Sequence, residues 1–414
     1  MGTEFGLFFT IDAGQHWIQL KGGAPTIACR DLEIQTQHTD LVCATFGRGI
    51  LILDDYSPLR RISTELVDRP AVLFPVRKAW SYIPETPLGS SEKGSLGDAF
   101  FTAPNPPFGA VFTYYLKDSL ETRRQIRRQA EHKLQQENKP VYYPSWESLR
   151  LEDAEDTPAI ILTVTDQAGA VVRRLTGPSS EGFHRIAWDL RYTRPTPVRA
   201  EEAEEIWYDT EGGWLVPPGY YTVRLSRYID GHFSPLGDAQ RFEVASLDRQ
   251  SLPASDMQAR LQFQRKVGDL RQAILGLKQV KRDTEIRLNS LKQALQQAPR
   301  DSKPLIMRAR RLQRELDNIA IVLDGDRSVS SRFEPTSPSL MDRINRTGRN
   351  MRSTADIPAT HRREYRIALE LLSDLRRRLH NLLKNDLAPL EREAEAVGAP
   401  WTPGRDIPEV PPSD

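Results

Sequence analysis

The sequence predicts a multidomain protein with an all-β first part and an antiparallel α-helical bundle after it. Short apolar runs separated by Gly or Asp recur about every ten residues near the start, which is typical of antiparallel β-structure. After residue 253, apolar residues instead recur at alternating spacings of three and four, the pattern of packed helices. Charge divides in the same way, because residues 251–414 carry 30 basic and 22 acidic side chains while the whole chain of 414 residues has a net charge of only +1. The two parts therefore differ in architecture.

The strand patterns fall into two groups with a connector between them. The first group predicts strands at 6–11, 16–20, 31–35, 41–45 and 49–53. Residues 57–108 are rich in Pro, Gly and Ser and are expected to form a linker, although apolar residues such as Leu73 and Trp80 indicate that part of it packs. The second group lies within 109–248 and predicts a β-sandwich, with strands at 110–116, 159–165, 170–175, 184–190, 220–225 and 240–244. An almost wholly polar helix at about 119–137 interrupts it and is expected to be solvated.

Residues 253–396 predict a three-helix antiparallel bundle, and residues 397–414 an extended tail. Ser255 and Gln258 resemble a capping box at the start of the first helix. Lys281 and Thr284 interrupt the apolar seam of that helix. A short helix near 339–347 is expected beside it. The predicted seam residues are Phe263, Val267, Leu270, Ile274, Leu277, Leu288, Leu291 and Leu295, then Leu305, Ala309, Leu312, Leu316, Ile319 and Leu323, then Tyr365, Ala368, Leu372, Leu375, Leu379 and Leu382.

Composition and motifs argue against several classes of function. No run of about 18 apolar residues occurs, so we expect no membrane span. Cys29 and Cys43 are the only cysteines, too few for a disulfide framework, and we expect both to be buried. No histidine spacing supports a metal site, and no glycine-rich loop supports a nucleotide or other cofactor. The basic run Arg376–Arg378 has acidic neighbours and no interleaved aromatic residues, so we expect no nucleic-acid partner.

The most informative motif is a hairpin signature at residues 10–17. Thr10, Asp12, Gly14 and Trp17 fit the pattern S/T-x-D-x-G-x-x-W. An Asp at such a turn accepts hydrogen bonds from backbone amides, and the glycine adopts unusual backbone angles. The tryptophan is expected to bury a large apolar face in the next strand. This Asp-box arrangement stabilises a hairpin and performs no chemistry.

Together with the segments around it, this motif resembles the last blades of bacterial BNR/Asp-box propeller proteins of the sialidase-like or sortilin-like "glycosyl hydrolase, BNR repeat" type. The stretches 2–8 and 40–55 carry that likeness, and residues 103–117 resemble the segment that follows the propeller. Residues 171–177, 182–189 and 217–225 resemble an Ig-like module of the flagellar hook-scaffold type. The implied fold is a partial propeller (1–56) and an Ig-like β-sandwich, followed by the helical bundle.

The resemblance also implies what is missing. Such propellers have about six to eight blades or more, whereas residues 6–20 would finish one blade and 30–54 would supply three strands of the last. The closing strand would come from an earlier part of a longer, truncated protein. Residues 1–56 are therefore expected to self-associate or to bind the missing blades.

Candidate catalytic residues do not form a set, so we assign no catalytic, cofactor-binding or metal-binding residue. A sialidase-type site needs an arginine cluster and several acidic or phenolic groups from different blades, which residues 1–56 cannot supply. Arg48 is the best remnant of a propeller-face residue, and Asp54 with Asp55 is expected to form a solvated turn. The acidic run 201–205 is expected to be solvated too. The pair Asp324 and Asp326 resembles only half of a calcium loop.

The sequence thus favours a non-catalytic, structural or interaction role over an enzyme. One alternative is the accessory region of a sialidase-like glycoside hydrolase whose active site lies on absent blades. A second is a sortilin-like peptide-binding propeller. The resemblance implies a carbohydrate or peptide ligand for the parent propeller and a secreted or periplasmic location, although no signal peptide is visible at Met1.

Overall fold

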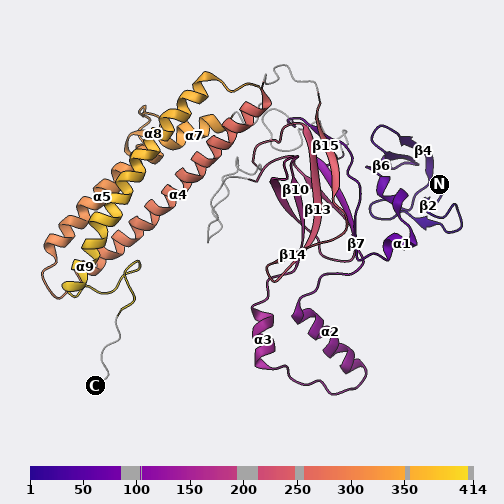
Figure 1. Ribbon diagram of the computed structural model, residues 1–414, viewed down its shortest axis with the longest axis horizontal. Helices are drawn as coiled ribbons and strands as arrows, with labels where there is room; N and C mark the ends of the chain where they lie inside the picture. Colours follow the sequence, from indigo (N-terminus) through magenta and orange to yellow (C-terminus); the bar gives the residue numbers. More distant parts are fainter. Residues whose placement is uncertain (85–102, 104, 194–212, 248–255, 350–354, 409–414) are drawn as a thin grey trace. The chain divides into compact units, whose positions relative to one another are not determined.

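The computed structural model describes residues 1–84, 103, 105–193, 213–247, 256–349 and 355–408. The chain divides into two compact units (Figure 1). Unit 1 comprises Met1–Thr193 and Pro218–Asp248, and unit 2 comprises Arg194–Pro217 and Arg249–Asp414. Unit 1 contains the β-sheets and unit 2 the long helices, as the change in sequence periodicity predicts. No helix of the described residues is both long enough and apolar enough to cross a membrane.

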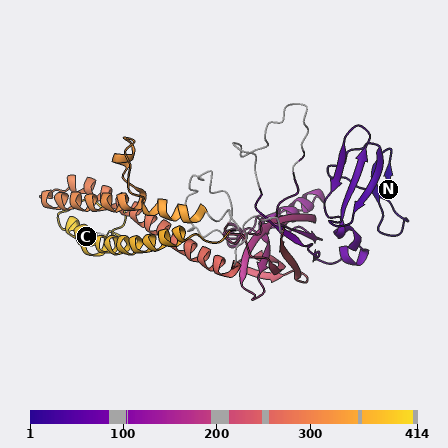
Figure 2. The ribbon, with the colours of Figure 1, turned by 90° about the horizontal axis from the view of Figure 1, so that it is seen from above.

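Two small antiparallel sheets open unit 1 (Figure 2). The first has the order β1-β2-β3, with β1 at Gly2–Thr3, β2 at Gly6–Phe9 and β3 at Ile18–Gln19. The second has the order β4-β5-β6, with β4 at Cys29–Gln35, β5 at Asp40–Thr45 and β6 at Ile50–Leu53. All five strands predicted in this region form. Cys43 is buried as expected, but Cys29 is only half-buried. Burial raises the pKa of the Cys43 thiol to about 12, and the neighbouring Cys29 adds to the shift.

Two larger sheets form the rest of unit 1. One has the order β11-β10-β13-β15-β8, with β14 paired to β13, and the other has the order β12-β9-β7. Rings from the two sheets meet in the core: Phe112 of β9 lies 5.5 Å from Phe242 of β15, and Trp188 of β12 lies 5.6 Å from Tyr221 of β13. The bounds are β9 Ala110–Leu116, β10 Ala159–Thr165, β11 Val171–Gly177, β12 Gly182–Trp188, β13 Gly219–Ile229, β14 His232–Pro235 and β15 Gln240–Ser246.

The segment predicted as a linker supplies strands to both larger sheets, which corrects that expectation. After the 3₁₀ helix η1 (Ser57–Arg61) and the short helix α1 (Thr64–Val67), β7 (Ala71–Leu73) pairs with β9. Then β8 (Ala79–Ser81) pairs in parallel with β15. Both strands are three residues long and lie at sheet edges, where the nearby prolines do no harm. The rest of the predicted linker, 85–102 and 104, lies outside the described residues.

The excursion between β9 and β10 contains two helices where the sequence predicts one. Helix α2 (Arg123–Gln136) begins at a capping box formed by Thr122 and Gln125. Helix α3 (Trp146–Asp153) follows, with the Ser145 hydroxyl accepting from the Ser148 amide. At eight residues it is too short to show a helical period in the sequence, which explains why it is missed.

Unit 2 is built on helix α4 (Met257–Gln296), with α5 (Lys303–Asp324) and α8 (Ala359–Asn381) beside it (Figures 1 and 2). All eight predicted seam residues of α4 are buried, and most of those of α5 and α8 are buried with them. The short helix expected near 339–347 forms as α7 (Leu340–Arg349), which contributes the buried Leu340 and Ile344 to the same core. The short α6 (Arg327–Ser330) links α5 to that region.

The polar interruption of the α4 seam is satisfied within the helix. Lys281 forms an ion pair with Glu285 at 3.0 Å, and the buried Thr284 hydroxyl donates to the Val280 carbonyl at 2.6 Å. The first helix begins at Asp256, whose carboxylate accepts from the Ala259 amide at 2.9 Å, so Asp256 caps it instead of the predicted Ser255. Ser255 itself lies outside the described residues.

The last predicted helix continues through a π-helical turn to the expected end of the bundle at residue 396. The turn covers Leu382–Leu387 and leads directly into α9 (Ala388–Ala396). Pro389 has no N–H to donate to the carbonyl of Asn385, and its ring would clash with that carbonyl in an α-helix. Widening the preceding turn relieves the clash and keeps Leu387 and Leu390 fully buried.

Candidate functional site

The Asp-box hairpin joins β2 to β3 and is held by hydrogen bonds of two side chains. The Asp12 carboxylate accepts from the His16 amide at 2.9 Å and contacts the His16 ring nitrogen Nδ1 at 2.6 Å. The Thr10 hydroxyl donates to Asp12 at 2.7 Å and accepts from the Gly14 amide at 2.9 Å. These bonds, led by the His16 amide, hold the pKa of Asp12 well below its usual range. The hydrogen bonds of Thr10 and Asp12 thus stabilise the turn.

Trp17 departs from its expected role. Its side chain is 48% exposed, so the large buried face predicted for it is not formed. A Cβ added to Gly14 would lie 4.0 Å from the Trp17 ring, so the ring passes near the turn without packing tightly against it. The strand that follows, β3, is only two residues long, and within the described ranges it pairs only with β2.

Replacing Asp12 by alanine should loosen the hairpin without unfolding unit 1. The His16 amide would lose its acceptor, and its hydrogen exchange should accelerate. In the intact protein the folded-state pKa of Asp12 lies below its unfolded value. The stabilisation is therefore present above the ordinary pKa of an aspartate and is lost as pH falls below it. Hydrogen-exchange rates of the His16 amide between pH 7 and pH 3 would test both the loss of its acceptor and the pH dependence. An unchanged rate in the Asp12→Ala variant would contradict the role of Asp12.

Asp55 lies at a buried corner and does not form the solvated turn expected for Asp54 and Asp55. Its side chain accepts from the Ser57 hydroxyl at 2.6 Å, and its amide donates to Asp40 at 2.9 Å. Arg77 donates to the same Asp40 oxygen at 3.3 Å and to the His38 carbonyl at 2.9 Å. Arg185 of β12 donates to the backbone carbonyls of Asp54, at 2.6 Å, and of Asp55. The carboxylates of Asp40 and Asp55 therefore stabilise the corner by hydrogen bonds.

The remaining predicted candidates are not brought together. Arg48 is exposed in the turn between β5 and β6, and the acidic run 201–205 lies outside the described residues. Asp324 pairs with Lys278 at 2.6 Å, and Asp326 caps α6 by accepting from the Ser328 amide at 2.9 Å. In the basic run, Arg377 pairs with Asp374, and Arg378 pairs with Glu315 at 2.9 Å. Nowhere in the described ranges do three or more His, Cys, Asp or Glu side chains gather as metal ligands would.

The feature with the clearest capacity to bind another chain is the outer edge of β6. Among the described residues, β6 pairs only with β5. The Thr45 amide donates to the Gly49 carbonyl at 3.0 Å, which makes Thr45 and Gly49 a hydrogen-bonded pair of the ladder. Hydrogen-bonded and non-hydrogen-bonded pairs alternate along antiparallel strands. The N–H and C=O groups of Ile50 and Ile52 therefore point away from β5, toward the open edge.

The side chains along this edge are apolar and exposed. Ile50 is 66% exposed and Ile52 is 59% exposed. They lie opposite Ala44 and Val42 of β5 and thus share one face of the sheet with them. An edge with both free backbone groups and an apolar face is a template for pairing with another strand. Sequence alternation alone identifies the strand but not its open edge, because neither Ile50 nor Ile52 carries a signal of missing neighbours.

Comparison with known proteins identifies no relative. No protein-family model, no curated protein and no solved structure matches the chain significantly.

Proposed function

We propose that the chain is the non-catalytic C-terminal part of a BNR/Asp-box propeller protein, with a structural and interaction role. The sheet β4-β5-β6 acts as a propeller blade that receives its fourth strand from another segment or another chain. The observation that carries the proposal is the open edge of β6, where two exposed isoleucines present both backbone groups and apolar side chains. The hydrogen-bonded Asp12 turn between β2 and β3 agrees with a preceding blade of the same type.

The corner beside the blade supports an anchoring role for the rest of unit 1. Arg185 and Arg77 reach this corner from outside the blade and bind its backbone and Asp40. A blade that ends in such a corner is fixed to the following sheets at one side while its outer edge stays open. The two larger sheets, which we take as an Ig-like sandwich, then present the blade to its partner.

A peptide ligand is the second candidate, because an extended peptide can add to an open sheet edge in the same way as a strand. Main-chain hydrogen bonds would supply affinity, and alternate side chains would lie against Ile50 and Ile52. This is the form that a sortilin-like, peptide-binding function would take in this chain. An accessory role in a glycoside hydrolase has no comparable observation in its favour.

Lysine at both edge positions should abolish self-association. In the Ile50→Lys/Ile52→Lys variant the charges would repel a second edge and remove the apolar contact, a device that natural edge strands use. We expect the mass of the unmodified chain, measured by light scattering over a concentration series, to rise with concentration, and that of the variant to stay at one chain. Phe5→Lys is the matched control, because Phe5 is 71% exposed but lies in the turn before β2.

Two outcomes would overturn the proposal. One is an unmodified chain that stays monomeric while the Ile50 and Ile52 amides resist hydrogen exchange, since the edge would then be covered within the chain. The other is an equal loss of association in the Phe5→Lys control, which would assign association to general surface hydrophobicity. Point variants are preferable to deletion of residues 1–56, because deletion would also remove the carbonyl partners of Arg185.

A further inference from the structure

The excursion between β9 and β10 is a helical hairpin held by ion pairs (Figure 1). Arg127 of α2 donates to both carboxylate oxygens of Glu152 in α3, at 2.6 and 2.9 Å, and Arg124 pairs with Asp153 at 2.5 Å. Arg123 reaches Asp230 in the turn between β13 and β14 at 2.5 Å. These contacts hold α2 and α3 side by side and fix the loop that joins them. The side chains of the loop are therefore held in place by the ion-paired helices on either side of it.

That loop and the first residue of α3 carry three large aromatic side chains that are mostly exposed. Tyr142 is 82% exposed, Tyr143 is 76% exposed and Trp146 is 70% exposed. The Tyr143 and Trp146 rings are 5.8 Å apart at an angle of 63°. Single exposed aromatic residues need no explanation, but three within five positions form a patch of the kind found at binding sites.

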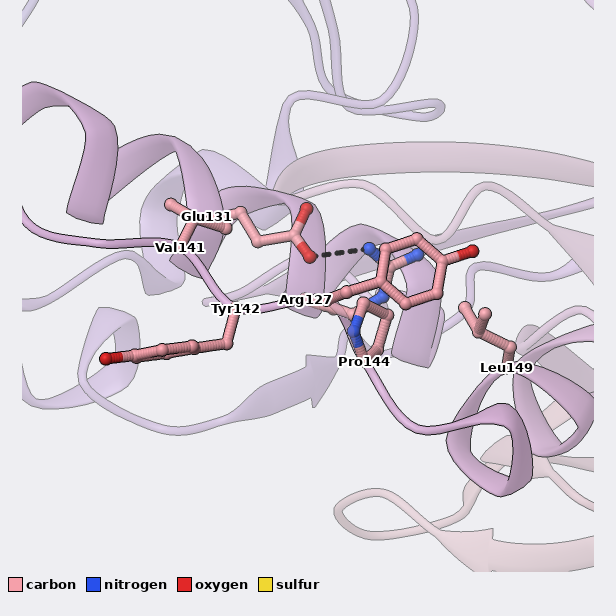
Figure 3. A pocket seen from close by; sticks show the side chains of 7 residues that line it. Arg127, Glu131, Val141, Tyr142, Pro144 and Leu149 are labelled. Atoms are coloured by element: carbon pink, nitrogen blue, oxygen red, sulfur yellow. Dashed lines mark hydrogen bonds and ion pairs between the residues drawn. The ribbon is translucent and has the colours of Figure 1, made fainter.

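A depression of about 360 Å³ lies between helix α2 and the loop that carries Tyr142 and Tyr143 (Figure 3). Tyr142, Tyr143 and Leu149 contribute its apolar walls, while Arg127 and Glu131 contribute its polar part. The two charged side chains are about three-quarters buried and pair at 2.7 Å through one oxygen of Glu131. The second Glu131 oxygen has no partner within the described part of the chain and is free to accept a hydrogen bond.

This combination suits an uncharged ligand with one apolar face and several hydroxyl groups. The broad faces of Tyr142 and Tyr143 are apolar, and the Glu131 carboxylate accepts strongly from hydroxyl donors. A sugar ring presents C–H groups on its faces and hydroxyls around its rim, and so meets both requirements. We propose that this aromatic depression binds a neutral oligosaccharide, with Tyr142 and Tyr143 stacking on successive rings and Glu131 accepting from their hydroxyls.

The charges around the depression disfavour an anionic ligand. Glu131 lines it, Glu147 lies in the first turn of α3, and the only lysine of the loop, Lys139, is paired with Glu137 at 2.6 Å. The basic side chains Arg128, His132 and Lys133 line a different depression on α2. Among the residues that line the aromatic depression, Arg127 carries the positive charge, and it is paired with both Glu131 and Glu152. A nucleic acid or an anionic lipid surface needs available positive charge beside the rings. The site is independent of the β6 edge.

Affinity electrophoresis of the full chain in gels containing a neutral polysaccharide tests the proposal. The probes are hydroxyethyl cellulose, neutral xylan, galactomannan and glycogen, with polygalacturonate and phosphatidylglycerol vesicles (by co-sedimentation) as anionic comparisons. We expect at least one neutral polymer to retard the chain, with a Kd below about 1 mM. Tyr142→Ala/Tyr143→Ala should weaken that binding about tenfold or more, since two ring contacts are lost. Glu131→Gln should weaken it less, because one acceptor oxygen remains.

Phe333→Ala is the matched control, because Phe333 is an aromatic residue 98% exposed in unit 2. It should bind as the unmodified chain does. Because Tyr142 and Tyr143 are exposed, their replacement should leave the helical circular dichroism and the melting temperature unchanged, so a loss of binding would not reflect unfolding. Three results would overturn the proposal: no neutral polymer retards the chain, the double variant is retarded as strongly as the unmodified chain, or only the anionic probes bind.

Discussion

Leu291→Ala should lower the free energy of unfolding of unit 2 by about 2–5 kcal/mol, the largest effect of any single truncation considered for this protein. Leu291 is fully buried on α4 and belongs to the core that α5, α7, α8 and α9 also line. Removal of its isobutyl group leaves a cavity that the surrounding helices cannot easily fill. Thermal unfolding of the full chain, followed by circular dichroism at 222 nm, reports mainly on these helices.

Ile286→Ala on the same helix is the matched control. Ile286 is 53% exposed, so its truncation should change stability by no more than about 0.5 kcal/mol. Both changes shorten a large aliphatic side chain on α4, and therefore both carry a similar change in helix propensity. Equal effects of the two substitutions would show that the seam of α4 is assigned to the wrong face.

Arg287→Met should destabilise unit 2 by about 2–3 kcal/mol at neutral pH. Arg287 donates through Nη2 to both oxygens of Glu391, at 2.8 and 2.9 Å. The Glu391 side chain is only 8% exposed, whereas that of Arg287 is 30% exposed. Breaking a buried ion pair costs about 3–5 kcal/mol because the remaining charge is left without a partner, and the partial exposure of Arg287 reduces this figure.

The pH dependence of this loss identifies its cause. Burial raises the pKa of Glu391 above its usual value, with a smaller contribution from Glu395, while Arg287 and Arg405 oppose the rise. A carboxyl group whose folded-state pKa is raised binds more protons folded than unfolded, so stability falls as pH rises from the ordinary glutamate pKa through the raised value. Without Arg287 the pKa rises further, and the fall becomes larger and extends to higher pH. The variant should therefore regain stability relative to the intact protein on acidification.

A double-mutant cycle separates the charge from the packing. Arg287→Met/Glu391→Gln removes both charges of this pair, so it should be more stable at pH 7 than Arg287→Met alone. Its stability should also lose the steep dependence on pH. If the single and double variants unfold alike at every pH between 4 and 8, the ionised carboxylate is not the source of the destabilisation. Guanidinium-induced unfolding would mask the charge effect, so urea is the suitable denaturant.

The helical core could be predicted from the sequence because its signal is local. Leu288, Leu291 and Leu295 recur at spacings of three and four, and a helix places such residues on one face whatever else the chain does. The bundle ends near the predicted residue 396, but the π-helical turn in its last helix was not predicted. The π-helical turn depends on Pro389, which the usual rule treats as the end of a helix, although here widening one turn allows the helix to continue.

Most strands of the β-rich unit were predictable, but β1, β7, β8, β14 and the contacts between distant segments were not. The sequence runs at 110–116 and 159–165 form strands with the expected bounds. Asp55, by contrast, was expected to be exposed to solvent. Nothing nearby in the sequence indicates that Arg185, 130 residues away, donates to its carbonyl oxygen. The aromatic depression was missed for a related reason, because Tyr142 and Tyr143 lie in a loop without periodicity. The ion pairs between the helices on either side, which position this loop, cannot be read from the local sequence.

The bonds made by Arg185 have a consequence for how this protein tolerates mutation. Its guanidinium binds the carbonyl oxygens of residues 54 and 55, and every amino acid supplies such an oxygen. The side chain at position 54 can therefore be replaced without loss of these two bonds. Substitution of Arg185 itself removes both bonds at once, and lysine, which lacks the planar fork, cannot replace it fully. These two bonds therefore depend on the identity of the donor, Arg185, and not on the side chains of Asp54 and Asp55.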